Sequence, residues 1–217
     1  MRALIIASAA IAAALMSTTA LAKPKPAATA LTQNDLRVCM GVDGSKPEDQ
    51  IPVCTKIINS GKVKAPHTGD YFATRGAAYF AIGDQKNAKA DLDKALTFRQ
   101  ASEVYFQRGA INLALFEWDA AKADYDKVIK LKPTFAPGHF MRGLVSYKTA
   151  DYAEALSFFD AAVNRVPTYS QALFARGATK IILSDTSGGK KDLSKARELN
   201  SKVDKELEAI GVTPRKD

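Results

Sequence analysis

An Arg-Gly pair recurs along this chain at a nearly constant spacing. Successive glycines of the pair are 33, 34 and 34 residues apart. A fixed period of this length indicates repeated supersecondary units, each of which cannot bury its own apolar face and must stack on its neighbours. The spacing therefore predicts a solenoid. The four pairs are Arg75-Gly76, Arg108-Gly109, Arg142-Gly143 and Arg176-Gly177.

Each period contains two stretches with the apolar spacing of an amphipathic helix. Alanine supplies much of the 47% hydrophobic content, which also favours helix over strand. We therefore expect an all-α fold, an α-solenoid of antiparallel helix pairs. The first helices are predicted over residues 70–81, 103–115, 137–148 and 171–183, and the second helices over residues 87–98, 119–131, 152–166 and 190–199.

An acidic residue recurs at the turn between the two helices of each unit. A carboxylate at this place can accept hydrogen bonds from the free N–H groups of the second helix, and it favours the positive end of the helix dipole. We therefore expect these side chains to cap the second helices. The four residues are Asp84, Glu117, Asp151 and Asp185.

The fourth unit departs from the pattern at Ser187-Gly188-Gly189. These residues stand where the second helix should begin, and glycine disfavours helix. A glycine-rich turn before a helix can bind an anion, but the full phosphate-loop pattern is missing. We therefore predict a flexible loop here, with the helix beginning at Lys190.

Further positions agree in phase with the glycines. A large residue precedes each glycine by four positions, at Phe72, Tyr105, His139 and Leu173, and a small residue follows it by twelve, at Ala88, Ala121, Ala155 and Gly189. On these residues the chain resembles the tetratricopeptide repeat family, although the leucine before the family's glycine is arginine in all four units. The resemblance implies that the chain binds another protein or peptide, and that it has four units, at residues 69–101, 102–135, 136–169 and 170–201.

The resemblance also implies where a partner would bind, because the first helix of each pair lines a concave groove in this family. The Lys/Asn/Arg pattern that clamps a C-terminal carboxylate in some members is missing, so an apolar helix or extended peptide is the expected ligand. Alternatively, the apolar side chains at these positions pack in the core between units, and the sequence leaves both readings open. The candidate partner-binding residues are Phe80, Phe106, Leu113, Phe140, Leu144, Tyr147, Phe174 and Ile181.

The four repeated arginines could bind phosphate or carboxylate groups of a ligand. However, the same position is apolar in the resembled family and lies between helices, and a buried arginine is normally paired. We therefore predict a structural role for them. The acidic residues available as partners are Asp91, Asp93, Asp124, Asp126 and Asp160.

Residues 1–22 have the three parts of a secretory signal peptide, namely Arg2, an apolar stretch from Leu4 to Met16, and a cleavage site at Ala20-Leu21-Ala22. The apolar stretch is too short to span a bilayer as a stable helix. We therefore expect export to a bacterial periplasm without stable membrane insertion. Residues 23–30, rich in proline and alanine, are predicted to be a flexible linker.

Two cysteines, Cys39 and Cys54, are expected to form a disulfide in an oxidising compartment. They would join the arms of a helical hairpin, a degenerate repeat at residues 31–68, with one arm at residues 32–40 and the other containing residues 53–58. The start of the second arm is left open. Ser45-Lys46-Pro47-Glu48 resembles a capping box, whereas Pro52 would break a helix begun there.

Residues 202–217 are predicted to form a C-terminal capping helix and tail. Val203, Leu207 and Ile210 share one face of a helix over residues 201–210, and Gly211 suits its end. Such a helix would cover the exposed apolar end of the last pair.

No catalytic constellation, metal site or cofactor-binding motif is recognisable in the sequence. The formal charge of +8 comes from 31 basic and 23 acidic residues that are scattered, so a nucleic-acid partner is not expected. We predict a non-catalytic scaffold or adaptor in the bacterial cell envelope. A periplasmic holdase-type chaperone with broad client binding is the alternative. An envelope enzyme acting on cell-wall sugars is least favoured, because its acid pair is not apparent.

Overall fold

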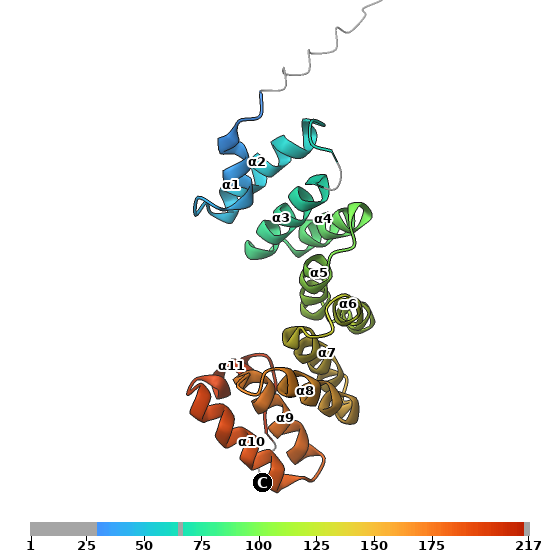
Figure 1. Cartoon of the computed structure of the whole chain (residues 1–217), viewed down its shortest axis with the longest axis vertical. Coiled ribbons are helices and arrows are strands. Elements are labelled where there is room, and N and C mark those ends of the chain that lie inside the picture. Colours follow the sequence, from blue (N-terminus) through green and yellow to red (C-terminus); the bar gives the residue numbers. More distant parts are fainter. Residues whose placement is uncertain (1–29, 65–66, 215–217) are drawn as a thin grey trace, which may run out of the picture. The chain divides into compact units, whose positions relative to one another are not determined.

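The computed structural model describes residues 30–64 and 67–214, so the expected signal peptide lies outside the described residues. Within them the chain forms eleven α-helices and no strand (Figure 1). The all-α fold class is thereby confirmed. The helices are α1 (Gln33–Met40), α2 (Pro47–Asn59), α3 (His67–Ala81), α4 (Gln85–Phe98), α5 (Ser102–Ala114), α6 (Trp118–Leu131), α7 (Ala136–Lys148), α8 (Tyr152–Arg165), α9 (Ser170–Ile182), α10 (Thr186–Leu199) and α11 (Val203–Ala209).

Four helix pairs form the repeated part of the chain: α3 with α4, α5 with α6, α7 with α8, and α9 with α10. The second helix of each pair also packs on the first helix of the next pair, which is how stacked units bury one continuous apolar face. The predicted α-solenoid of helix pairs is thus confirmed. The exact unit boundaries stay predictions.

The same turn ends the first helix of every pair. In the second pair, the backbone N–H of Glu117 donates to the Asn112 carbonyl (2.8 Å) and that of Phe116 donates to the Leu113 carbonyl (3.1 Å). These bonds pair carbonyl groups that have no partner inside the helix. Their geometry requires one residue of the turn to adopt left-handed backbone angles. That residue is Gly83, Phe116, Ala150 or Ser184 in the four turns.

The predicted acidic caps are present in three of the four turns. Asp84, Asp151 and Asp185 each accept a hydrogen bond from a backbone N–H in the first turn of the following helix. Glu117 makes no such bond, and its carboxylate instead pairs with Lys89 on α4. Glutamate is a poorer capping residue than aspartate, and it is absent from the preferred set.

The prediction of a flexible loop at Ser187-Gly188-Gly189 is wrong, because these residues form the first turn of α10. Asp185 accepts a hydrogen bond from the N–H of Gly188 (2.9 Å), which stabilises the helix start. Glycine is needed at the next position because a methyl group at Gly189 would lie 2.7 Å from the carbonyl oxygen of Gly177. The two glycines therefore let α9 and α10 approach closely, and this packing overrides the low helix propensity of glycine.

The repeated arginines join neighbouring units. In the second unit, Arg108 donates two hydrogen bonds to Asp124 of α6 (3.0 and 2.5 Å) and one to Asp93 of the preceding α4 (2.7 Å). Arg142 and Arg176 make the same kind of bridge from their own second helix to the preceding one. Their acidic partners are Asp126 and Glu154 for Arg142, and Asp160 and Asp192 for Arg176. The predicted structural role of the arginines is confirmed.

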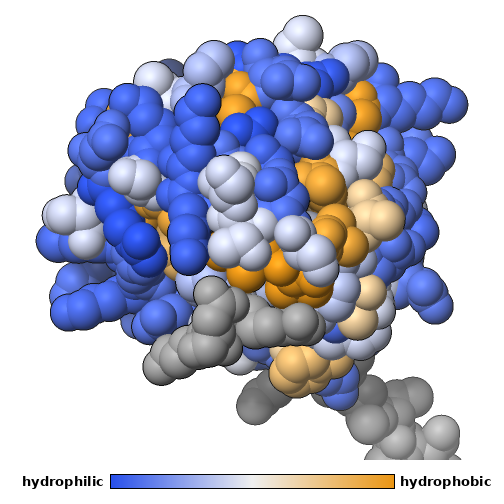
Figure 2. Space-filling view, turned by 90° about the horizontal axis from the view of Figure 1, so that it is seen from below, coloured by the Kyte–Doolittle hydropathy of each residue, from blue (hydrophilic) through white to orange (hydrophobic). Residues whose placement is uncertain are grey.

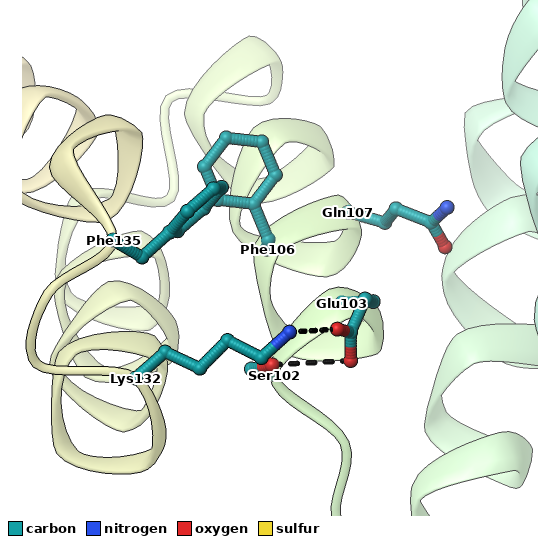
Figure 3. Close-up of a pocket in the computed structure, with 6 residues that line it drawn as sticks. All are labelled: Ser102, Glu103, Phe106, Gln107, Lys132 and Phe135. Carbon is teal, nitrogen blue, oxygen red and sulfur yellow. Dashed lines mark hydrogen bonds and ion pairs between the residues drawn. The ribbon is translucent and has the colours of Figure 1, made fainter.

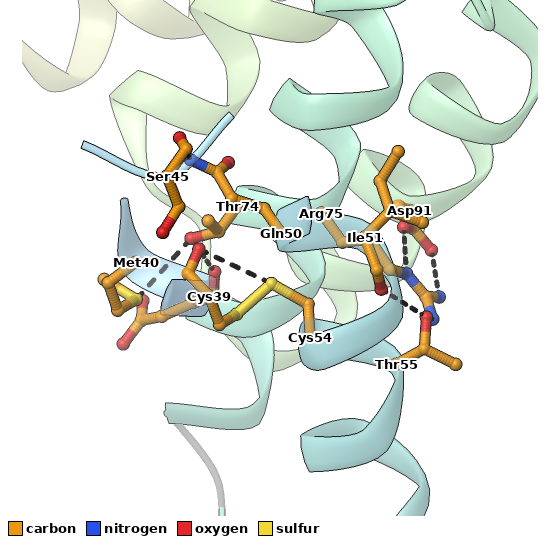
Figure 4. Close-up of a disulfide and its surroundings, with 11 residues drawn as sticks. Cys39, Met40, Ser45, Gln50, Ile51, Cys54, Thr55, Thr74, Arg75 and Asp91 are labelled. Atoms are coloured by element: carbon orange, nitrogen blue, oxygen red, sulfur yellow. Dashed lines mark hydrogen bonds and ion pairs between the residues drawn. A yellow bond between two sulfur atoms is a disulfide. The ribbon is translucent and has the colours of Figure 1, made fainter. Parts of the chain in front are cut away.

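The first arginine departs from this pattern. Arg75 donates two hydrogen bonds to Asp91 of α4 (2.7 and 2.8 Å). Toward α2 it donates a third to the hydroxyl of Thr55 (2.8 Å), where the other arginines have a carboxylate (Figure 4). At this boundary the arginine therefore forms a hydrogen bond to a neutral hydroxyl and no ion pair.

A disulfide between Cys39 and Cys54 joins α1 to α2, as predicted, with the two Cα atoms 4.9 Å apart. Both cysteines are fully buried beside Ile57. The second arm, α2, begins at Pro47, and Pro52 lies inside it, so a start at Pro52 is wrong. Pro52 is on the exposed face of the helix, where the carbonyl oxygen it leaves unpaired can bond to water.

Replacing both cysteines by serine is expected to lower the stability of the α1–α2 hairpin by about 3 kcal/mol, the chain-entropy value for a loop of this length. Because each unit of a solenoid contacts only its neighbours, the loss should stay local. Amide hydrogen exchange should accelerate in α1 and α2, with α7 to α10 unaffected. Adding a thiol reductant to the serine variant is the control and should change nothing further. Equal protection of α1 in both proteins would contradict the expectation.

The C-terminal helix α11 is shorter than predicted and lies against α9 and α10. Val203 and Leu207 are buried as expected, but Ile210 is exposed because the helix ends before it. The surface seen from below Figure 1 is mostly hydrophilic, with an apolar patch near its centre and smaller apolar patches elsewhere (Figure 2).

Candidate protein-interaction surface

Three of the hollows in the described residues lie along α3, α5 and α7 and open to solvent. The largest of these three, of about 640 Å³, lies between α5, α7 and the end of α11, and we call it the central groove. Its wall is mainly apolar, with one lysine and one glutamate at the rim. The lining residues are Ala110, Leu113, Ala114, Phe116, Trp118, Met141, Leu144, Lys148, Glu208, Ala209, Ile210 and Gly211.

Two aromatic side chains stand at the α5–α6 turn beside the central groove. Phe116 is 71% exposed, and its ring meets that of Trp118 edge to face, with centroids 5.4 Å apart. Phe116 also has a φ of 60°, in the left-handed region that bulky residues rarely adopt. Glycine occupies the equivalent place in the first turn, at Gly83. The fold therefore keeps an exposed phenylalanine at a position whose backbone favours glycine.

A smaller hollow of about 310 Å³ lies beside the N-terminal part of α5 (Figure 3). The rings of Phe106 and Phe135 meet edge to face in its wall, with centroids 5.6 Å apart. Below them Lys132 pairs with Glu103, and the hydrogen bond from Lys132 lowers the pKa of Glu103 to about 2. This ion pair forms another part of the wall.

The third hollow, of about 330 Å³, lies between α3 and α5. Small and polar side chains line it, including Ala73, Thr74 and Ala77, with an ion pair between Asp70 and Arg99 at its edge. It offers no aromatic or large aliphatic side chain apart from Met40 and Val104, so the central groove is the more apolar of the two.

The predicted partner-binding residues fall into two groups. Phe80 is 40% exposed, and Phe106 and Leu113 are partly buried. The other five are buried in one core cluster between α7, α8, α9 and α11, and burial raises the pKa of the tyrosine among them. Contact of any of these residues with a partner stays a prediction. The five buried residues are Phe140, Leu144, Tyr147, Phe174 and Ile181.

The structure brings Leu113 and Leu144 together in the central groove, and places Phe106 in the smaller hollow. Sequence reasoning missed Phe116, Trp118 and the contribution of residues 208–211. The sequence does contain a signal for Phe116. When the four turns are aligned, this large aromatic residue stands where the other turns have the small residues Gly83, Ala150 and Ser184.

No group of three or more His, Cys, Asp or Glu side chains is placed to hold a metal ion in the described residues. His139 lies at a packing position, as its repeat register predicted. Its ring is buried, which lowers its pKa, and Nε2 lies 2.9 Å from the Pro133 carbonyl oxygen. In the part of the chain that the structure describes, no helix is both long and apolar enough to span a membrane.

Stacked helix pairs with a groove along their first helices define an α-helical repeat protein of the kind that presents an extended surface to a ligand. The family model described as tetratricopeptide repeat matches residues 70–101 and 102–135, the pairs α3–α4 and α5–α6. Residues 70–135 of this chain are therefore tetratricopeptide repeats. No curated protein matches it by sequence.

Solved structures with the same fold are similar to most of the chain. MamA is 20% identical with a TM-score of 0.68, over 80% of this chain and 97% of MamA. MamA from Desulfovibrio magneticus RS-1 is 17% identical with a TM-score of 0.69, over 81% and 99% of the two chains. YrrB, described as a TPR protein with an unusual peptide-binding site, is 18% identical with a TM-score of 0.65, over 79% and 87%. At these identities the likeness shows the fold.

Proposed function

We propose that this chain is a non-catalytic scaffold or adaptor of the bacterial cell envelope, which binds an apolar helix or peptide of a partner protein in its central groove. The observation that carries the proposal is Phe116. A left-handed backbone costs a non-glycine residue about 1–2 kcal/mol, and the ring gains little burial in return. An aromatic side chain kept at such a place suits an interface, where aromatic residues are enriched among the strongest contacts.

The surroundings of Phe116 support the same function. Trp118, Leu113, Met141 and Ile210 supply apolar surface around it, and Lys148 and Glu208 can orient a partner's polar groups at the rim. An apolar groove with a few polar groups is the usual form of a peptide-binding surface. The similar fold of YrrB, whose description includes a peptide-binding site, gives further support.

The envelope location in the proposal rests on two independent features. The first 22 residues have the pattern of a signal peptide, and the buried Cys39–Cys54 disulfide suits an oxidising compartment.

Replacing Phe116 by glycine is expected to weaken partner binding about tenfold or more, since a central aromatic contact contributes 2 kcal/mol or more. The same change relieves backbone strain, so thermal stability should stay equal or rise. The measurement is crosslinking in intact cells with identification of the captured protein, followed by affinity measurement with that protein.

The matched control is Leu131→Ala, which removes an exposed apolar side chain from α6, outside the central groove. It should leave capture unchanged. Undiminished affinity of Phe116→Gly would exclude the central groove as the site. Suppression of aggregation for several unrelated clients, without one stoichiometric partner, would instead identify the chain as a holdase.

A further inference from the structure

The C-terminal segment, residues 201–214, lies on the surface of the first helices α7 and α9. Three of its side chains, Val203, Leu207 and Val212, are at most 1% exposed. They belong to the same core cluster as the buried groove candidates Phe140, Leu144, Tyr147, Phe174 and Ile181. The segment therefore packs in one core with the groove positions of the third and fourth units, and of the second unit's candidates Leu113 packs against this cluster and stays partly buried.

Polar contacts hold the segment at both of its ends. The Tyr147 hydroxyl of α7 donates to the Thr213 carbonyl (3.1 Å), and the Gln171 amide of α9 donates to Glu206 (3.1 Å). Arg197 of α10 pairs with Asp204 (2.7 Å). The segment thus combines three apolar anchors with side-chain hydrogen bonds along its length, as a bound amphipathic peptide does.

The helix within the segment has little stability of its own. It comprises seven residues, its N-cap residue Lys202 makes no side-chain capping bond, and the chain leaves it through Gly211 in the left-handed region (φ 72°). Helices much shorter than about 12 residues are marginal in water, so this one depends on its contacts with α9 and α10.

We infer that the segment is an intramolecular ligand of the α7–α9 surface, and that the partner is an amphipathic peptide of the same pattern which displaces it. The pattern is a short helix with apolar residues at the positions of Val203 and Leu207 and an acidic residue at that of Glu206, followed after a turn by an apolar residue at that of Val212. This inference rests on the proposed function and names the kind of partner.

Displacement of the segment would also enlarge the binding surface. Residues 208–211 form one wall of the central groove, so their departure joins that groove to the α7–α9 surface. A partner peptide longer than the segment would then run from α9 past α7 to Phe116 on the α5–α6 turn. The exposed aromatic residues and the covered groove positions thereby become parts of one site.

The test uses a labelled peptide with the sequence of residues 201–214 and the full chain carrying Leu207→Ser. This change weakens the hold of the tethered segment, which otherwise competes at a local concentration on the order of millimolar. The variant should bind the peptide about tenfold or more tightly than the unchanged chain does. A peptide with the same Leu207→Ser change should not bind. Lys205→Ser, at an exposed position of α11, is the matched control and should behave as the unchanged chain.

A folded Leu207→Ser chain that does not bind the peptide would overturn the inference. If this variant fails to fold, amide exchange in the unchanged chain decides instead. Residues 203–212 should then exchange about tenfold or more faster than α9, as expected of a segment that opens separately. Equal protection of α9 and α11 would show that the segment is a permanent part of the core. Peptide binding does not involve Phe116, so failure here is distinguishable from failure of the central groove to bind a partner.

Discussion

Replacing Phe174 by alanine is expected to lower the free energy of unfolding by about 3–5 kcal/mol, the usual cost of removing a buried phenylalanine ring. The side chain is 0% exposed and packs in the core cluster shared by α7, α8, α9 and α11. The neighbouring helices are tied in place by their own contacts, so they cannot collapse fully into the cavity. Denaturant unfolding followed by circular dichroism measures the effect.

The control for this prediction is Phe80→Ala, which removes the same ring from an exposed position of α3. It should change stability by about 0.5 kcal/mol or less, as most surface substitutions do. A cost below about 1 kcal/mol for Phe174→Ala would show that α11 covers this ring only loosely. Both residues are phenylalanines that the sequence predicts to bind a partner. Comparison of the two variants thus distinguishes a phenylalanine of the core from one on the surface.

Replacing Asp124 by alanine is expected to lower the free energy of unfolding by about 3–5 kcal/mol. Its carboxylate is 3% exposed and accepts hydrogen bonds from Arg108 and from the Asn112 amide (2.8 Å). The buried Asn112 amide would be left without this partner, and Arg108 would keep only its ion pair with Asp93. Such a loss costs more than the interaction itself contributes, because the buried amide stays unsatisfied.

Asp93→Ala is the matched control, because Asp93 pairs with the same Arg108 from a position that is 52% exposed. Its loss should cost about 0–1 kcal/mol. Thermal or denaturant unfolding of the two variants therefore compares a buried and an exposed partner of one guanidinium group. Equal costs would mean that Asp124 is reached by solvent in the native state.

The sequence predicted the repeated part of the fold well because its signals are local and recur. The Arg-Gly pairs fixed the phase, and the acidic turn residues marked where the second helices begin. The error at Ser187-Gly188-Gly189 arose because propensity was weighed without tertiary context. The Asp185 cap and the contact between Gly177 and Gly189 stabilise a helix that glycine alone disfavours.

The candidate site was less predictable, since its form depends on contacts outside the repeat. Register placed Phe140 and Phe174 at groove positions, but both are buried in a core cluster to which α8, α10 and the C-terminal segment also contribute. No periodic signal encodes that contact. Ile210 was wrongly predicted to be buried for the same reason. Helical spacing alone could not show that α11 ends at Ala209. Phe116 differs, as comparison of the four turns would have revealed it from the sequence.

The arginine bridges have a consequence for how the chain unfolds. In a linear array, the coupling between nearest neighbours sets how many units melt as a single cooperative block. Arg108, Arg142 and Arg176 each supply an ionic coupling between adjacent pairs, so α3 to α10 should behave as one block. The boundary between α2 and α3 has the Thr55 hydroxyl in place of a carboxylate. This boundary therefore lacks the ion pair that the repeated arginine supplies at the next three boundaries, and the disulfide constrains the hairpin on its far side.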